Sequence, residues 1–169
     1  MVVAACGGSM SETEYVEGLN ALVVDAGSGL EAALATYEQI ADPTLEDFVA
    51  FVERQLVVEY AVRDRFETLD PPASIDDVHR IMVDTLARII AVAEGLVEVA
   101  DTVSSLEEME QTREFAEYQA VNADADSMCL DVQAKINDLS SGPVIDSPWV
   151  TDLRLTVEAF LDCDDVGTS

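Results

Sequence analysis

The stretch from Ser74 to Val103, SIDDVHRIMVDTLARIIAVAEGLVEVADTV, decides the fold of this chain. Apolar residues recur along it at steps of three and four, the spacing that places side chains on one face of an α-helix. They are Ile75, Val78, Met82, Leu86, Ile89, Ala93, Leu96, Ala100 and Val103. We therefore expect a long amphipathic helix that is capped at Ser74 and buries this one face.

Two more helices are expected before this stretch. A capping box at Ser11 starts the first of them, and Asp42-Pro43 ends it. The second starts near Thr44 and ends at Pro71-Pro72, because proline lacks the backbone N–H that a helix interior uses. Their inward faces are expected to hold Tyr15, Leu19, Leu22, Ala26, Leu30, Leu34, Tyr37 and Ile40, and then Leu45, Phe48, Val49, Val52, Leu56, Tyr60 and Phe66.

The remaining sequence is also helical in pattern, and signals for β-strands are nearly absent. A capping box at Ser105 begins a fourth helix that is expected to run to Leu139, and Ser147-Pro148 begins a short fifth one. We therefore predict an all-α fold, an up-and-down bundle of four long helices plus a short C-terminal helix. Residues 1–10 are expected to be a tether, and residues 11–169 to form a single domain.

The charge of the chain restricts its partners. It holds 35 Asp and Glu against 8 Lys and Arg, which gives a formal net charge of -27. Nucleic acids and anionic membrane surfaces need a basic surface, so neither is expected as a partner, and mutual repulsion favours a monomer. Acid-first pairs at i, i+4, which support helices, are Glu59–Arg63, Asp76–Arg80, Asp84–Arg88 and Asp131–Lys135.

The same charge predicts a dependence of stability on salt. We expect the melting temperature to rise between about 0.05 and about 1 M NaCl, because the Debye length shortens from above about 10 Å to about 3 Å. Screening relieves the net charge of -27 more than it weakens a few exposed ion pairs. A thermal melt that is flat or moves downward over this range would contradict the expectation.

The N-terminus carries a motif that indicates where in the cell the protein is located. The run Val3-Ala4-Ala5-Cys6, followed by Gly-Gly-Ser, resembles the lipobox of bacterial and archaeal lipoproteins. That resemblance implies that Cys6 is lipidated, that a polar tether follows it, and that the domain lies at the cell envelope on the extracytoplasmic face. Only five residues precede Cys6, fewer than a signal peptide needs, so a cytoplasmic N-terminus with a small apolar cysteine is the alternative.

Two further cysteines lie near the C-terminal end of the chain. Cys129 and Cys163 form an even pair once Cys6 is set aside as an anchor. In an oxidising compartment we expect them to form a disulfide, which would stabilise the fold by about 3–4 kcal/mol on the chain-entropy model. The alternative is two separate buried thiols, which pack as small apolar groups. The sequence contains no Cys-x-x-Cys motif of a redox or zinc site.

One run resembles a nucleotide-binding motif in its letters alone. Residues from Gly27 to Ala32 match G-x-G-x-x-A, but no later segment supplies the partner strand of a dinucleotide fold. The apolar stripe of the first helix continues in phase through the run. We therefore expect no cofactor here, and instead a kink or a close helix crossing at Gly27 and Gly29.

Candidate metal and catalytic residues are also incomplete. Asn122, Asp124 and Asp126 match the first three ligands of a calcium loop, whose glycine and glutamate are missing, so an acidic kink is expected. His79 is the single histidine, whereas di-iron bundles need two. We expect it to pack near the surface at the start of the third helix, away from any deep pocket. No catalytic, cofactor-binding or metal-ligating residue is expected.

The connection between the second and third helices carries a second resemblance. The run from Phe66 to Ser74, FETLDPPAS, with His79 in the following helix, resembles a pattern in small actinobacterial secreted or lipid-anchored helical proteins. In those proteins a leucine and a double proline join two helices. The resemblance implies a helical bundle outside the cytoplasm and carries no settled activity.

These observations favour a lipid-anchored, extracytoplasmic helical binding module that is not an enzyme, with an unknown protein or small molecule as its ligand. One alternative is a carboxylate- or metal-dependent enzyme, which predicts a concave pocket with convergent polar groups and shifted carboxylates. Another is a cytoplasmic acidic adaptor for a basic protein, which predicts reduced thiols and no anchor. The binding module predicts a filled core and a broad surface groove.

Overall fold

The computed structural model describes residues 9–123, 125–140 and 147–161, and this part of the chain contains helices and no strand. The helices are α1 (Glu12–Glu38), α2 (Leu45–Phe66), α3 (Asp76–Ala100), α4 (Leu106–Glu110), α5 (Arg113–Ala123), α6 (Ala125–Ser140) and α7 (Pro148–Leu161). The predicted all-α class is therefore confirmed for the described residues.

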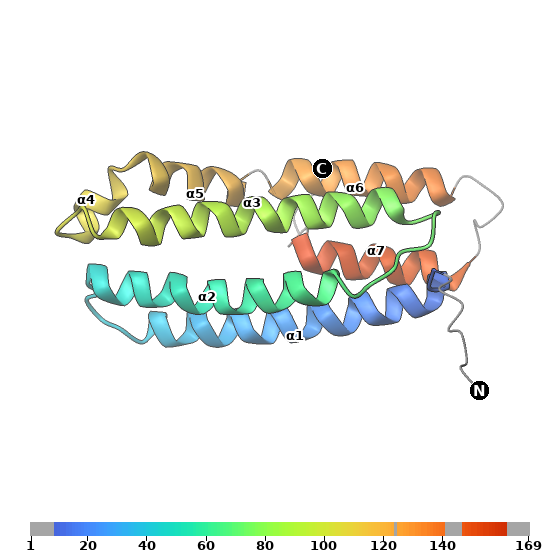
Figure 1. Ribbon diagram of the computed structural model, residues 1–169, viewed down its shortest axis with the longest axis horizontal. Helices are drawn as coiled ribbons and strands as arrows, with labels where there is room; N and C mark the ends of the chain where they lie inside the picture. Colours follow the sequence, from blue (N-terminus) through green and yellow to red (C-terminus); the bar gives the residue numbers. More distant parts are fainter. Residues whose placement is uncertain (1–8, 124, 141–146, 162–169) are drawn as a thin grey trace, which may run out of the picture.

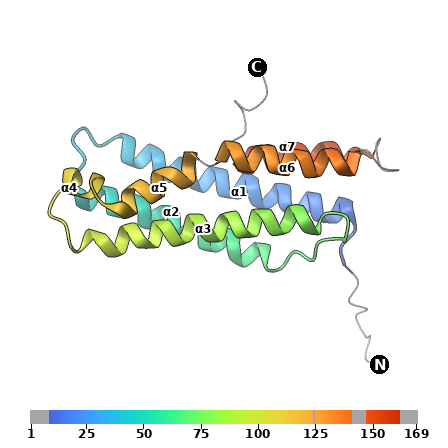
Figure 2. The ribbon, with the colours of Figure 1, turned by 90° about the horizontal axis from the view of Figure 1, so that it is seen from above.

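Three long helices, α1, α2 and α3, form the frame of the molecule (Figure 1). Helix α2 packs against both α1 and α3. Helices α5 and α6 follow one another along α3, and α7 packs against α1 and α6 (Figure 2). The core therefore has different neighbours at its two ends, with α5 near one end and the pair α6 and α7 near the other.

The predicted fourth long helix is wrong in detail, because three shorter helices take its place. The first break lies at Thr112, whose hydroxyl donates to the carbonyl of Met109 at 2.7 Å and accepts the backbone N–H of Phe115 at 3.1 Å. A threonine that bonds its own backbone in this way ends one helix and caps the next. Helix α5 ends at Ala123 and α6 begins at Ala125, and the expected acidic kink falls on the residue between them, which lies outside the described part of the chain.

The starts of the first two long helices agree with the prediction. Reciprocal capping boxes are present, between Ser11 and Glu14 at α1 and between Thr44 and Asp47 at α2. The predicted cap at Ser74 is wrong, since α3 has no side-chain cap. The Ser74 hydroxyl instead donates to Oε1 of Glu12 at 3.1 Å, which ties the start of α3 to the start of α1.

The predicted inward face of α1 is correct over its first half and shifts in its second half. Tyr15, Leu19 and Leu22 are fully buried, whereas Leu34 is 45% exposed and its neighbour Ala33 is buried instead. Helix α7 lies beside the N-terminal half of α1 and does not reach this end of it (Figure 1). The C-terminal half of α1 has fewer neighbours for this reason, so part of its apolar stripe faces solvent.

A close crossing of α1 and α2 occurs at Gly29, as the sequence predicted. A Cβ atom at Gly29 would lie 2.9 Å from Cγ2 of Val58, a distance that real Cβ contacts do not show. At Gly27 a Cβ atom would meet nothing within 4 Å. The two glycines therefore have different roles. Packing against Val58 requires a glycine at position 29, whereas Gly27 borders empty space.

This difference predicts opposite effects of two similar substitutions. Gly27→Ala is expected to raise the free energy of unfolding by up to about 1 kcal/mol, because alanine is the better helix former. Gly29→Ala is expected to lower it by about 1–3 kcal/mol, because Val58 must move to admit the methyl group. Urea denaturation of the two variants measures both values, and shifts of the same sign would contradict the assignment.

Three of the predicted surface ion pairs are replaced by others. Lys135 lies 3.5 Å from Asp77 and is not paired with Asp131. Arg80 pairs with Asp77 rather than with the acid four residues before it. The guanidinium of Arg63 lies 3.0 Å from Asp64 and 5.0 Å from the centre of the Tyr60 ring. Its predicted partner, Glu59, is buried inside the bundle. The burial of the Glu59 carboxylate, which was expected at the surface, is the difference from the prediction that matters most for function.

Candidate ligand-binding cavity

The single histidine is half-buried at the start of α3, near one end of the bundle, and it does not line the cavity described below. Nδ1 of His79 and the hydroxyl of Tyr15 are hydrogen-bonded at 2.9 Å. The imidazole also meets the rings of Tyr15 and Phe66 edge-on, with ring centres 5.8 and 5.6 Å apart. Burial lowers the pKa of His79 and raises that of Tyr15, so both side chains are neutral at pH 7. These contacts explain His79 as a packing residue.

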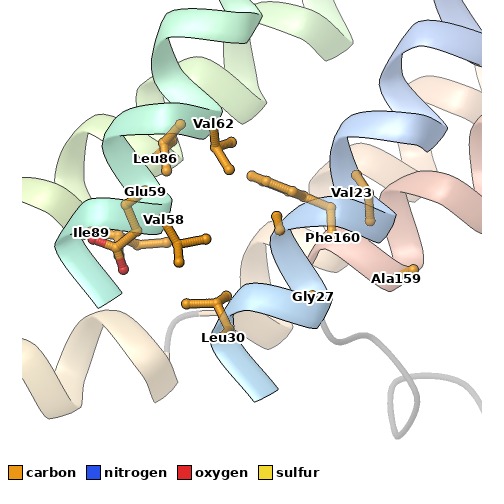
Figure 3. A pocket seen from close by; sticks show the side chains of 11 residues that line it. Val23, Gly27, Leu30, Val58, Glu59, Val62, Leu86, Ile89, Ala159 and Phe160 are labelled. Carbon is orange, nitrogen blue, oxygen red and sulfur yellow. The ribbon is translucent and has the colours of Figure 1, made fainter. Parts of the chain in front are cut away.

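A cavity of about 120 Å³ lies deeper in the bundle, between α1, α2, α3 and α7. It is lined by Val23, Ala26, Gly27, Leu30, Val58, Glu59, Val62, Leu86, Ile89, Ala159 and Phe160. Figure 3 shows Glu59, Leu86 and Ile89 on the side of α2 and α3, with Val23 and Phe160 on the side of α1 and α7. The helices therefore leave a pocket between them, whose wall includes the exposed Ala159.

Small residues explain why this space is left open. Gly27 contributes no side chain, and Ala26 and Ala159 each contribute one methyl group to the wall. The close crossing at Gly29 holds α1 and α2 together one turn away, with Val58 as the contact. Since protein interiors are otherwise packed as densely as organic crystals, a space of this size between four helices is a specific feature of the fold.

Glu59 is the one titratable side chain among the residues that line this cavity. It is 8% exposed, and within the described part of the chain its Oε2 atom has no hydrogen-bond partner. Burial raises its pKa to about 7. A buried carboxylate without a partner is costly, because the charged form loses its hydration and gains no hydrogen bond in return.

The sequence contains the signal that would have placed Glu59 inside. Val52, Leu56, Val62 and Phe66 are buried, and Glu59 lies on the same face of α2, three residues from both Leu56 and Val62. The i, i+4 spacing to Arg63 instead led to a surface ion pair. A charged residue in the middle of an apolar stripe indicates a buried charge, and such charges occur more often at functional sites.

The motifs that were set aside as sites on sequence grounds lie only partly within the described residues. The run from Gly27 to Ala32 lies inside α1, without the strand that a dinucleotide site requires. Within residues 9–123, 125–140 and 147–161, no three His, Cys, Asp or Glu side chains are grouped so that they could hold a metal ion. The side chains of Asn122, Asp124 and Asp126 lie outside the described part.

The predicted lipidation and disulfide sites are only partly within view. Cys129 is buried on α6, at 1% exposure, but Cys163 and Cys6 lie outside the described residues. The disulfide and the lipid anchor therefore stay predictions. None of the helices in the described ranges has the length and apolar character needed to cross a membrane.

Among the described residues the wall of the cavity is apolar except at Glu59, and those that α1, α3 and α7 contribute to it carry no polar side chain. Its function must therefore be inferred from this chain alone. Comparisons with protein-family models, with curated proteins and with solved structures find no match to this chain.

Proposed function

We propose that this chain is a binding module that takes up a small apolar ligand in the cavity around Glu59 without transforming it. The observation that carries the proposal is the carboxylate of Glu59, which is buried at the wall of an apolar cavity with one oxygen unpartnered. Most buried polar atoms in proteins have partners, so an exception at a cavity supports a role in binding.

The size of the cavity limits the ligand. Its volume is about 120 Å³. Engineered apolar cavities of about 150 Å³ stay dry and bind benzene. The ligand, or the part of it that enters the bundle, is therefore about as large as one six-membered ring or a short alkyl chain.

The lining of the cavity supports binding rather than catalysis. General acid–base chemistry needs a second group that positions or activates the substrate, and the other lining side chains are hydrocarbon. A carboxylate-dependent enzyme remains the second candidate, because the pKa of Glu59, raised to about 7, suits proton transfer at neutral pH. Conversion of a bound probe that is lost in Glu59→Gln would favour the enzyme.

The proposal also includes the location of the protein in the cell. The lipobox-like run that ends at Cys6 supports a module anchored at the extracytoplasmic face, where Cys129 and Cys163 can form their disulfide. Incorporation of a labelled fatty acid in cells that is abolished by Cys6→Ser would support the anchor. Labelling of both thiols in unfolded, unreduced protein from the envelope would contradict the disulfide.

Titration calorimetry with toluene tests the binding role. We expect saturable binding of one toluene to the unmodified protein and loss of that binding in Gly27→Leu, whose added side chain fills the cavity. Ser28→Leu is the matched control, because it adds the same side chain at an exposed position in the same turn of α1. Absence of binding to the unmodified protein, or equal binding to both variants, would contradict the proposal.

A further inference from the structure

We propose that the ligand is a small apolar monocation, namely a ring or short alkyl chain that carries one protonated amine. This inference rests on the proposed binding function and adds the chemical class of the ligand. It follows from the position of one carboxylate in an otherwise hydrocarbon wall, and from the net charge of the molecule.

The first step is the hydrogen bonding of Glu59. Its Oε2 atom is buried and has no partner among the described residues. An ionised carboxylate only accepts hydrogen bonds, and no other lining side chain has a donor to offer. A ligand that pairs with the carboxylate of Glu59 must therefore bring its own N–H or O–H, on an end of the molecule that faces α2.

The second step is the charge of Glu59. Two bases that follow it on α2 are engaged elsewhere, since Arg63 pairs with Asp64 at 3.0 Å and Arg65 pairs with Asp25 at 2.6 Å. The only lysine, Lys135, lies 3.5 Å from Asp77 on α3. None of these ion pairs of the described residues includes Glu59, and a ligand cation can take the role of its counter-ion.

The third step is the choice between a cation and a neutral or anionic ligand. A hydrogen bond between an ammonium and a carboxylate is about twice as strong as one between neutral groups. The folded protein already bears the cost of burying Glu59, so binding adds only the desolvation of the amine. A molecule with a net charge of -27 attracts cations and repels anions, which disfavours a carboxylate ligand on approach and at the site.

The two other surface grooves give weaker support for a ligand site than the cavity at Glu59 does. The groove between α3 and α5, lined by Val92, Ala120 and Val121 among others, is shallow and has no buried polar group in its wall. The groove between α1 and α7 is lined partly by Glu17 and Asp152, which are exposed. Neither shows, among its described residues, a buried side-chain polar atom that lacks a partner, whereas the cavity at Glu59 does.

Three probes of similar shape separate the possibilities. Benzylamine, benzyl alcohol and benzoate are titrated calorimetrically into the unmodified protein and into Glu59→Gln at about pH 8, where the amine is protonated and most of Glu59 is ionised. We expect benzylamine to bind the unmodified protein at least about tenfold more tightly than benzyl alcohol, and benzoate to bind least. In Glu59→Gln the affinity for benzylamine falls at least about tenfold, and that for benzyl alcohol changes by less than about threefold.

The outcomes distinguish this inference from the binding role on which it rests. Equal affinities for the amine and the alcohol, or a preference for the amine that survives in Glu59→Gln, overturn the cation and leave the cavity as a site for neutral ligands. Tighter binding of benzoate overturns it as well. Failure of toluene and of all three probes to bind overturns both. Benzylamine held by the acidic surface would bind Gly27→Leu equally well, which would also overturn the inference.

Discussion

Replacing Phe66 with alanine is expected to lower the free energy of unfolding by about 3–5 kcal/mol, the usual cost of truncating a fully buried phenylalanine. Phe66 is 1% exposed at the end of α2. Its ring meets His79 of α3 edge-on, and it meets Phe160 of α7 with ring centres 5.8 Å apart. The substitution therefore removes a contact that joins three helices at the cavity, and urea denaturation measures its cost.

The conservative variant separates this packing role from a general intolerance of the position. Phe66→Leu keeps most of the apolar volume, so we expect a loss below about 1.5 kcal/mol. Phe160→Ala removes the partner ring on α7, which is less buried than Phe66, and its cost is expected to be smaller than that of Phe66→Ala. A loss below about 1 kcal/mol for Phe66→Ala would contradict the docking of α7 described above.

The stability of the protein relative to that of Glu59→Gln is expected to fall by about 2 kcal/mol between about pH 5.5 and about pH 8. Burial raises the pKa of Glu59 from 4.5 to about 7, so the folded state binds this proton more tightly than the unfolded state does. The stabilisation is therefore complete below the unfolded value of 4.5 and is lost as the pH rises through about 7. Chemical denaturation at several pH values measures the difference.

The comparison with Glu59→Gln removes the contributions of other titrating groups. The pKa of His79 is lowered by burial, so its contribution has the opposite sign and is lost as the pH falls through its ordinary value. His79 is present in both proteins, and its effect cancels. On α2 the neighbouring charged groups are Arg63 and Asp64, which pair with each other, and the hydroxyl of Tyr60 donates to Glu94 of α3.

The cavity walls formed by α1, α3 and α7 contain no titratable residue that would complicate this difference. A difference between the two proteins that stays constant within about 0.5 kcal/mol from about pH 5.5 to about pH 8 would contradict a raised pKa at Glu59. A difference that changes in the opposite direction would indicate an internal counter-ion, because a partner cation lowers the pKa of a carboxyl.

Much of the fold follows from local signals in the sequence. The capping boxes at Ser11 and Thr44 place the starts of the first two helices because each acts through its own backbone. The predicted end of the second helix at Pro71-Pro72 is too late, since α2 ends at Phe66. The break at Thr112 was missed because a threonine in a helical pattern carries no sign of whether its hydroxyl will bond the backbone. The apolar helical pattern of the sequence continues on both sides of Thr112, so it does not indicate the break.

The cavity could not be predicted from the same signals. Apolar periodicity shows which residues face inward, but the volume they leave depends on how four helices meet at Gly27 and Ala159. Glu59 was assigned to the surface because its spacing to Arg63 suits an ion pair, although its place in the apolar stripe of α2 indicates burial. The two patterns conflict at Glu59, and its position on the apolar face of α2 predicts its burial correctly, whereas its spacing to Arg63 does not.

The most direct test of the central claim is the pH titration of the Glu59 side-chain carboxyl, followed by its ¹³C chemical shift and assigned with Glu59→Gln. A buried carboxylate without a partner predicts a pKa of about 7 in the free protein. With saturating benzylamine the pKa is expected to fall, because a bound ammonium stabilises the charged form. A Glu59 carboxyl that titrates at its ordinary value of 4.5, with and without benzylamine, would contradict the account.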